Sequence, residues 1–132
     1  MKLIIASDIH GSAYWCGRLC ELIEAENPDK IVLLGDLLYH GPRNDLPRDY
    51  APKAVIPMLS ALKDKILAVR GNCEAEVDQM VLPFNCMADY ALLECDGVPY
   101  GITGFSGSFP CRKASAFRPS ADTADGGGGP FC

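Results

Sequence analysis

The chain lacks several features that would assign it to a protein class at once. Its 132 residues include no apolar run of 18 or more and no basic segment leading into an apolar one, so they predict neither membrane insertion nor secretion. The formal net charge is -5, and no cluster of lysine and arginine is present, which argues against binding along a nucleic-acid backbone. We therefore expect a single-domain cytoplasmic protein whose partners include neither membrane nor nucleic acid.

Cysteine is present, but not in the spacing of a known site. The seven cysteines are an odd number and no two form a C-x-x-C pair, so neither a disulfide framework nor a zinc knuckle is predicted. Gln79 stands six positions after Cys73, so there is no C-x5-R phosphatase loop there. Cys16 and Cys20, four residues apart, make either half a metal site or, as we favour, part of a helix's apolar face.

Three apolar runs, each ending on polar residues, set the predicted architecture. Residues 3–11 are LIIASDIHG, residues 30–36 are KIVLLGD, and residues 65–74 are KILAVRGNCE. Such runs are typical of strands buried on both faces. Helical patterns at 13–26, where Ser12 can cap the helix, and at 53–63, where Pro57 should kink the helix or delay its start, separate them. Right-handed crossovers then make the strands parallel, and the fold class is α/β.

The second half of the chain carries weaker signals. A short helix is predicted at 75–80, and a hairpin at 90–95 and 98–102, because Asp96-Gly97 between apolar runs is a strong hairpin signal. From Gly101 to Cys132 the sequence is rich in glycine and has no periodic apolar pattern. We expect no regular core element in this segment, which we assign as an irregular or disordered tail at 101–132.

The polar residues at the ends of the three strands are candidate metal ligands. Parallel strands bring Asp8, His10, Asp36 and Asn72 to one edge of the sheet, where open α/β sheets bind their ligands. Asp8 and His10 are two apart, so alternation along a strand predicts that they share a side. Carboxylate, imidazole and amide groups suit manganese, zinc or iron, and a central carboxylate can bridge two ions for phosphate ester hydrolysis. Roles as helix caps or turn residues are the alternative.

The loop at 39–52 is long and rich in turn residues, so it should form a rim over the site. Within it, Arg43 either holds a substrate phosphate or is a solvated charge. His40 is expected to be a loop residue rather than a metal contact. Cys73, which adjoins Asn72, is expected to line the site and not to act as a nucleophile.

These motifs resemble those of the calcineurin-like metallophosphoesterases. The matching blocks are D-x-H at Asp8–His10, G-D at Gly35-Asp36, G-N-C at 71–73 and the loop LYHGPRN at 38–44, and they cover about residues 1–100. The resemblance implies a layered α/β/β/α sandwich and a phosphodiesterase that acts on small phosphoesters with two divalent ions, usually Mn2+, with Zn2+ or iron as alternatives. It also implies that Asp8 and His10 bind one ion, Asp36 bridges, and Asn72 binds the other.

The chain departs from the family pattern after residue 100. The family continues to a G-H and then a G-H-x-H motif, which supply three further histidines, whereas this chain has two histidines and none after His40. We therefore divide it into an N-terminal family part at 1–100 and a non-family segment at 101–132, and expect an out-of-frame or truncated product with an incomplete second sheet and impaired activity. The alternative is an inactive protein-binding scaffold of the same fold. The sequence leaves the oligomeric state open.

Overall fold

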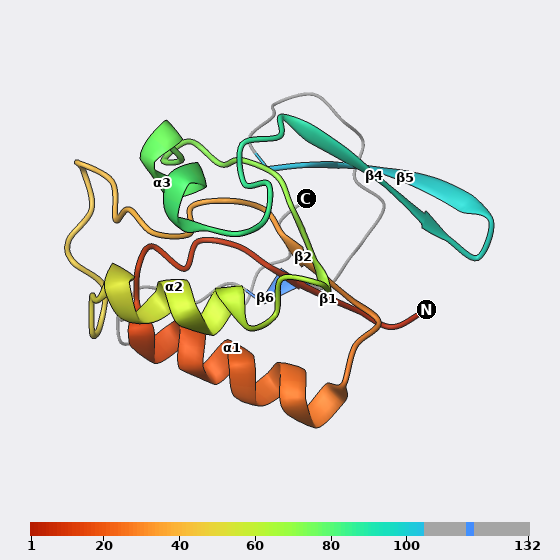
Figure 1. Ribbon diagram of the computed structural model, residues 1–132, viewed down its shortest axis with the longest axis horizontal. Helices are drawn as coiled ribbons and strands as arrows, with labels where there is room; N and C mark the ends of the chain where they lie inside the picture. The colour runs from red at the N-terminus through yellow and green to blue at the C-terminus, as the bar shows by residue number, and fades with distance from the viewer. Residues whose placement is uncertain (105–115, 118–132) are drawn as a thin grey trace, which may run out of the picture.

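A parallel sheet lies at the centre of the computed structural model, which describes residues 1–104 and 116–117 (Figure 1). Its strands are β1 (Leu3–Ala6), β2 (Lys30–Leu33), β3 (Ile66–Ala68) and β6 (Ala116–Phe117), in the order β3-β2-β1-β6. All neighbouring pairs in this order run parallel. The predicted parallel arrangement of the first three strands is confirmed, so their carboxyl ends share one edge.

Two helices, α1 (Ala13–Glu26) and α2 (Pro52–Ser60), lie together on one side of the sheet (Figure 1). Ser12 caps α1 as predicted, because its hydroxyl accepts a hydrogen bond from the Trp15 backbone nitrogen at 3.2 Å. Asn27 ends α1 in the left-handed region at φ 40°. The interface of these helices with the sheet forms the core, whose largest fully buried side chains include Leu19, Ile31, Leu33, Leu37, Val55 and Leu59.

The second helix differs from the prediction of 53–63. It begins one residue earlier, with Pro52 at its first position, where the missing N–H costs nothing, and Pro57 lies inside it. It ends at Ser60, because the following residues tighten into successive turns. In these turns Lys63 N–H donates to the Ser60 carbonyl at 3.3 Å, and Lys65 N–H donates to Leu62 at 3.0 Å. Strand β3 follows these turns.

A second, two-stranded antiparallel sheet contains β4 (Tyr90–Cys95) and β5 (Val98–Thr103). The predicted hairpin turn is confirmed: Asp96 and Gly97 both have positive φ, at 52° and 78°. The hairpin and α3 (Glu76–Val81) lie across the parallel sheet from α1 and α2 (Figure 1). As far as the structure describes the chain, the layers follow the predicted sandwich. Among the described residues, no helix is long and apolar enough to cross a bilayer.

The segment from residue 101 onward was predicted to hold no regular core element. The structure differs in two places: β5 runs to Thr103, one residue beyond the hairpin strand predicted at 98–102, and Ala116–Phe117 pair with Ile5 and Ala6 of β1. The second pairing was missed because a pairing of two residues leaves no periodic pattern. The prediction for residues 105–115 and 118–132 lies outside the described residues.

Candidate metal centre

The loops that follow β1 and β2 are joined through their backbones at the carboxyl edge of the sheet. Asp8 N–H donates to the Gly35 carbonyl at 3.2 Å, His10 N–H to the Asp36 carbonyl at 2.8 Å, and Gly11 N–H to the Leu37 carbonyl at 2.8 Å. These bonds hold the two loops side by side beyond the strands. They place the side chains of Asp8, His10 and Asp36 around one point.

The backbone geometry at these three residues corrects one expectation. β1 ends at Ala6, and Asp8, His10 and Asp36 all have positive φ, at 60°, 50° and 57°. Asp8 and His10 therefore do not share a side through strand alternation. Their side chains meet in a loop beyond β1, where the backbone of each residue is left-handed. Aspartate and histidine tolerate this region better than most residues, and such conformations gather at functional sites because the surrounding structure must hold them there.

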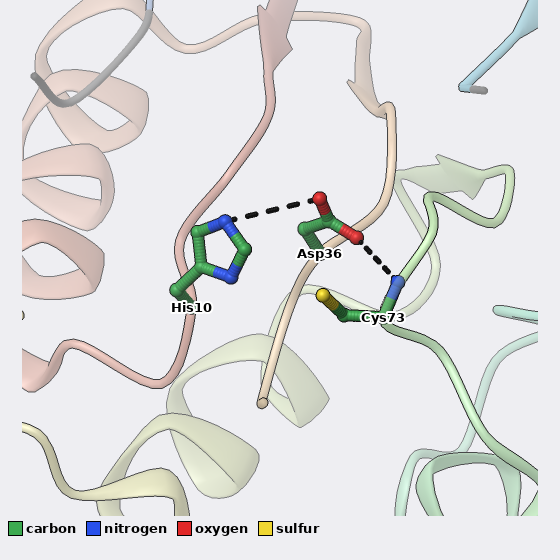
Figure 2. Close-up of side chains that lie close together, drawn as sticks. All are labelled: His10, Asp36 and Cys73. Atoms are coloured by element: carbon green, nitrogen blue, oxygen red, sulfur yellow. Dashed lines mark hydrogen bonds and ion pairs between the residues drawn. The ribbon is translucent and has the colours of Figure 1, made fainter. Parts of the chain in front are cut away.

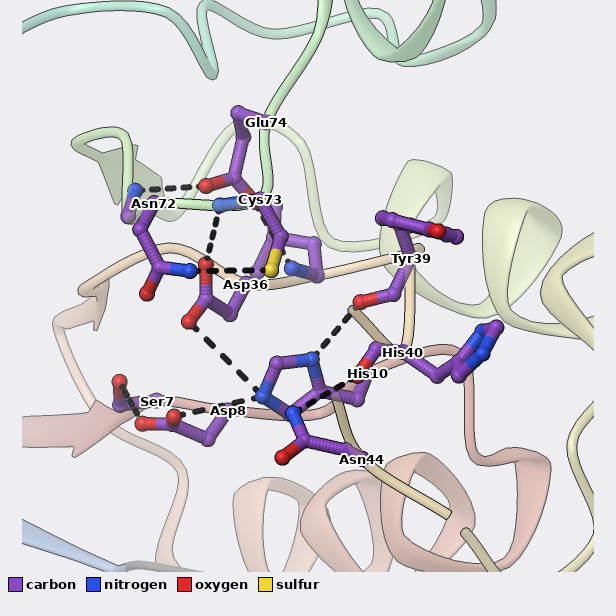
Figure 3. A network of polar contacts seen from close by, with 12 residues as sticks. Ser7, Asp8, His10, Asp36, Tyr39, His40, Asn44, Asn72, Cys73 and Glu74 are labelled. Atoms are coloured by element: carbon purple, nitrogen blue, oxygen red, sulfur yellow. Dashed lines mark hydrogen bonds and ion pairs between the residues drawn. The ribbon is translucent and has the colours of Figure 1, made fainter. Parts of the chain in front are cut away.

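His10 lies between the two carboxylates. Its Nε2 is 3.4 Å from Asp8 Oδ1 and 3.8 Å from Asp36 Oδ2 (Figure 3). Its Nδ1 is 2.7 Å from the Tyr39 carbonyl oxygen, and because a carbonyl only accepts, Nδ1 carries a hydrogen. Nε2 therefore faces both carboxylates. A cation bound at that point would contact the ring nitrogen and offset the two negative charges.

The electrostatics of the ring agree with this geometry. The pKa of His10 is raised, chiefly because Asp8 accepts a hydrogen bond from the ring, while burial of the ring works in the opposite direction. The Tyr39 carbonyl and the charge of Asp36 raise this pKa further. A proton or a metal ion at Nε2 offsets the two negative charges, so the donor set of imidazole and carboxylates fits a divalent cation.

The loop after β3 brings two more residues to the site. Asn72 and Cys73 line the same pocket as Asp8, His10 and Asp36, with a volume of about 560 Å³. Cys73 N–H donates to Asp36 Oδ1 at 2.8 Å, and the Asn72 amide donates to the Cys73 sulfur at 3.2 Å (Figures 2 and 3). The structure thus brings all four predicted ligands together, and their role as ligands stays a prediction.

Cys73 is poorly suited to act as a nucleophile. Burial raises the pKa of its thiol to about 11, and the charges of Asp36 and Glu74 add to this effect. Nucleophilic cysteines have pKa values lowered by positive neighbours, so the thiol form is favoured here in the absence of a cation. The side chain lines the pocket.

The rim loop also reaches the pocket. Tyr39, Gly41, Arg43 and Asn44 contribute to its lining, so the predicted rim and the candidate phosphate contact Arg43 lie at the site. His40 is not among the lining residues. Its ring packs edge-on against Tyr39 and Tyr50, with centroids 4.9 and 5.2 Å away, in keeping with a loop residue.

Sequence reasoning missed the role of Glu74. This buried carboxylate accepts the Gly71 N–H at 2.6 Å and the Leu37 N–H at 2.8 Å, and so ties the loop after β3 to the loop after β2 (Figure 3). Glu74 is part of the polar sequence GNCE at 71–74, after the third predicted strand. No local pattern in the sequence distinguishes a carboxylate that turns back into the protein from one that faces solvent.

Two glycines allow these loops to approach closely. A Cβ at Gly35, which has φ 93°, would meet the backbone of Gly71, and a Cβ at Gly71 would meet the Asp36 carboxylate. Glycine at both positions therefore lets the loop after β2 and the loop after β3 lie in direct contact.

Comparisons with known proteins agree with this geometry. The model of a family described as calcineurin-like phosphoesterase matches residues 1–126, which extends beyond the predicted boundary at residue 100. Phosphodiesterase YfcE of Escherichia coli strain K12 is 50% identical over 90 residues, which cover 68% of this chain and 49% of the relative, and YfcE of strain O157:H7 matches equally.

A solved structure of YfcE, a phosphoesterase from E. coli, matches with a TM-score of 0.76 and 45% identity. The match covers 78% of this chain and 57% of that one. The chain thus spans about half the length of the curated relatives it matches.

Proposed function

The chain belongs to the calcineurin-like phosphoesterase family, and from this premise we propose that its pocket is the metal site of a phosphodiesterase. The observation that carries the proposal is the position of His10 Nε2, which faces Asp8 at 3.4 Å and Asp36 at 3.8 Å. Imidazole and carboxylate donors around one point are what a divalent cation requires. Asn72 completes the set from the third loop.

Each residue has a defined part in this proposal. Asp8 and His10 would hold one ion, Asp36 would be shared with a second, and Asn72 would contact the second through its amide. Such ions would supply an activated water and neutralise charge on the phosphoryl oxygens. Tyr39 orients the His10 ring, because its carbonyl accepts the Nδ1 hydrogen at 2.7 Å. For the complete family site we propose two Mn2+ ions, with Zn2+ or iron as alternatives.

The pocket favours a small phosphoester as substrate. Its volume of about 560 Å³ suits a compact ligand, and Arg43 is the cationic side chain among the residues that line it. The planar guanidinium of Arg43 can hold two phosphate oxygens. A small, cytoplasmic phosphodiester or phosphomonoester meets these requirements.

Activity in this chain is expected to be weak. Among its 132 residues there are two histidines, and His40 does not line the pocket. Fewer protein ligands leave the second ion held mainly by Asp36, Asn72 and water, so it should dissociate first. The same shortage of histidine favours a second candidate, a protein-binding scaffold of this fold that no longer hydrolyses phosphoesters.

Calorimetric titration with Mn2+ tests the proposal, together with hydrolysis of a chromogenic phosphodiester. Asp36→Asn should abolish binding and any Mn2+-dependent hydrolysis, whereas Asp45→Asn, which alters an exposed acid of the rim loop, should leave both unchanged. Undiminished Mn2+ binding by Asp36→Asn would show that the bridging role is wrong. Binding of Mn2+ by the parent without measurable hydrolysis would favour the scaffold.

A further inference from the structure

We propose that Cys73 is a further ligand of the ion that Asp8, His10 and Asp36 hold, which gives this chain a preference for a thiophilic cation such as Zn2+ over Mn2+. This inference rests on the proposed function, because it concerns the same cation site. It adds a sulfur donor to a site otherwise described with nitrogen and oxygen.

The three side chains converge on one point (Figure 2). One ligand atom from each of His10, Asp36 and Cys73 lies within 4.8 Å of the other two. A tetrahedral Zn2+ with its usual bond lengths to sulfur, nitrogen and oxygen needs ligand atoms about 3.3–3.7 Å apart. The His10 Nε2 to Asp36 Oδ2 distance, 3.8 Å, is already close to this value. The three donors therefore need to approach one another by at most about 1 Å to reach this geometry.

The surroundings orient each donor toward the shared point. Tyr39 accepts the Nδ1 hydrogen of His10 and leaves Nε2 for the ion. The Cys73 N–H occupies Asp36 Oδ1, which leaves Oδ2 for the ion. The Asn72 amide donates to the Cys73 sulfur at 3.2 Å, an interaction that stabilises negative charge on a sulfur ligand.

The rim loop gives the sulfur room at this point. A Cβ at Gly41 would lie 3.3 Å from Cys73 Sγ, so a larger residue there would press on the sulfur. Cys73 is half-buried and lines the pocket, whereas Cys95 lies in the β4–β5 hairpin, with its sulfur 3.6 Å from Met1 Sδ. Cys95 is therefore a matched control.

Donor chemistry determines which ion this set prefers. Thiolate and imidazole ligands favour Zn2+ and Co2+, while Mn2+ is better served by carboxylate, carbonyl and water oxygens. With sulfur added to the protein donors, the affinity for Zn2+ should rise more than the affinity for Mn2+ does. Replacing the sulfur by a hydroxyl should therefore reduce the preference for Zn2+ to that of the remaining nitrogen and oxygen donors, and leave the His10–Asp36 part of the site intact.

Titration of the purified chain with Co2+ and competition between Zn2+ and Mn2+ test the inference. The parent and Cys95→Ser should show a sulfur-to-cobalt charge-transfer band and bind Zn2+ at least tenfold more tightly than Mn2+. Cys73→Ser should lose the band and at least tenfold of its Zn2+ affinity, with Mn2+ affinity changed less than threefold. Zinc X-ray absorption of the parent, which needs no variant, should show a sulfur neighbour at about 2.3 Å.

The outcomes separate this inference from the proposed function. If Cys73→Ser keeps the band and its Zn2+ affinity, or if the absorption spectrum shows no sulfur neighbour, Cys73 is not a ligand. In that case loss of binding in Asp36→Asn still supports the cation site. If Asp36→Asn binds both ions as tightly as the parent does, the cation site of the proposed function is itself wrong.

Discussion

Replacement of the buried Glu74 by glutamine tests how the site is held together. Its side chain is 7% exposed, and its two oxygens accept the N–H groups of Leu37 and Gly71 at 2.8 and 2.6 Å. Each hydrogen bond to a charged acceptor contributes about 1.5–3 kcal/mol, so the pair is worth about 3–6 kcal/mol. Glu74→Gln keeps one acceptor oxygen but turns an NH2 group toward the other N–H.

We therefore expect Glu74→Gln to lower the free energy of unfolding by about 2–3 kcal/mol, which is close to the contribution of one of the two hydrogen bonds. Against a total stability of about 5–15 kcal/mol, this variant still folds. Urea unfolding followed by circular dichroism measures the loss. Glu76→Gln is the matched control, because that acid is exposed in the first turn of α3, and it should change stability by less than about 0.5 kcal/mol.

The same substitution should weaken metal binding without removing a ligand. Glu74 positions the loop that carries Asn72 and Cys73 against the loop that carries Asp36, and loss of such a supporting contact typically costs about 10–100-fold in metal affinity. Calorimetric titration of Glu74→Gln with Zn2+ measures this effect. A stability and a Zn2+ affinity equal to those of the parent would refute the argument that Glu74 joins the two loops.

Two further predictions concern the backbone and the coding sequence. Gly35→Ala should lower the free energy of unfolding in urea by more than about 2 kcal/mol, because the new Cβ would meet the Gly71 backbone. Gly97→Ala is the control, since Gly97 also has positive φ but has open space around it, and should lower this free energy by only about 1–2 kcal/mol. Equal losses in the two variants would contradict the close approach of Gly35 to Gly71. The encoding nucleotide sequence, read in its other two frames past codon 100, should contain G-H and then G-H-x-H, and a chain restored in that frame should hydrolyse a chromogenic phosphodiester faster by orders of magnitude. Absence of these motifs from every frame would favour the scaffold.

Much of the fold could be predicted from the sequence because its signals are local. The apolar runs within residues 3–11, 30–36 and 65–74 predicted the parallel strands, and the pattern from Cys16 to Ile23 predicted the buried face of α1. Burial of a strand on both faces requires continuous apolar sequence, and burial of one helical face requires a period of 3.6, so both leave a trace in the order of residues. The predicted parallel arrangement of these strands also indicated which polar residues meet at one edge of the sheet.

Only the tertiary structure decided how those residues meet. Asp8 and His10 converge through left-handed backbone held by hydrogen bonds to the neighbouring loop, not through strand alternation. The hydrogen bonds from the Leu37 N–H to Glu74 and from the Cys73 N–H to Asp36 join residues 37 apart in sequence. Such contacts leave no periodic trace, because they depend on how two loops lie beside each other once the strands have paired.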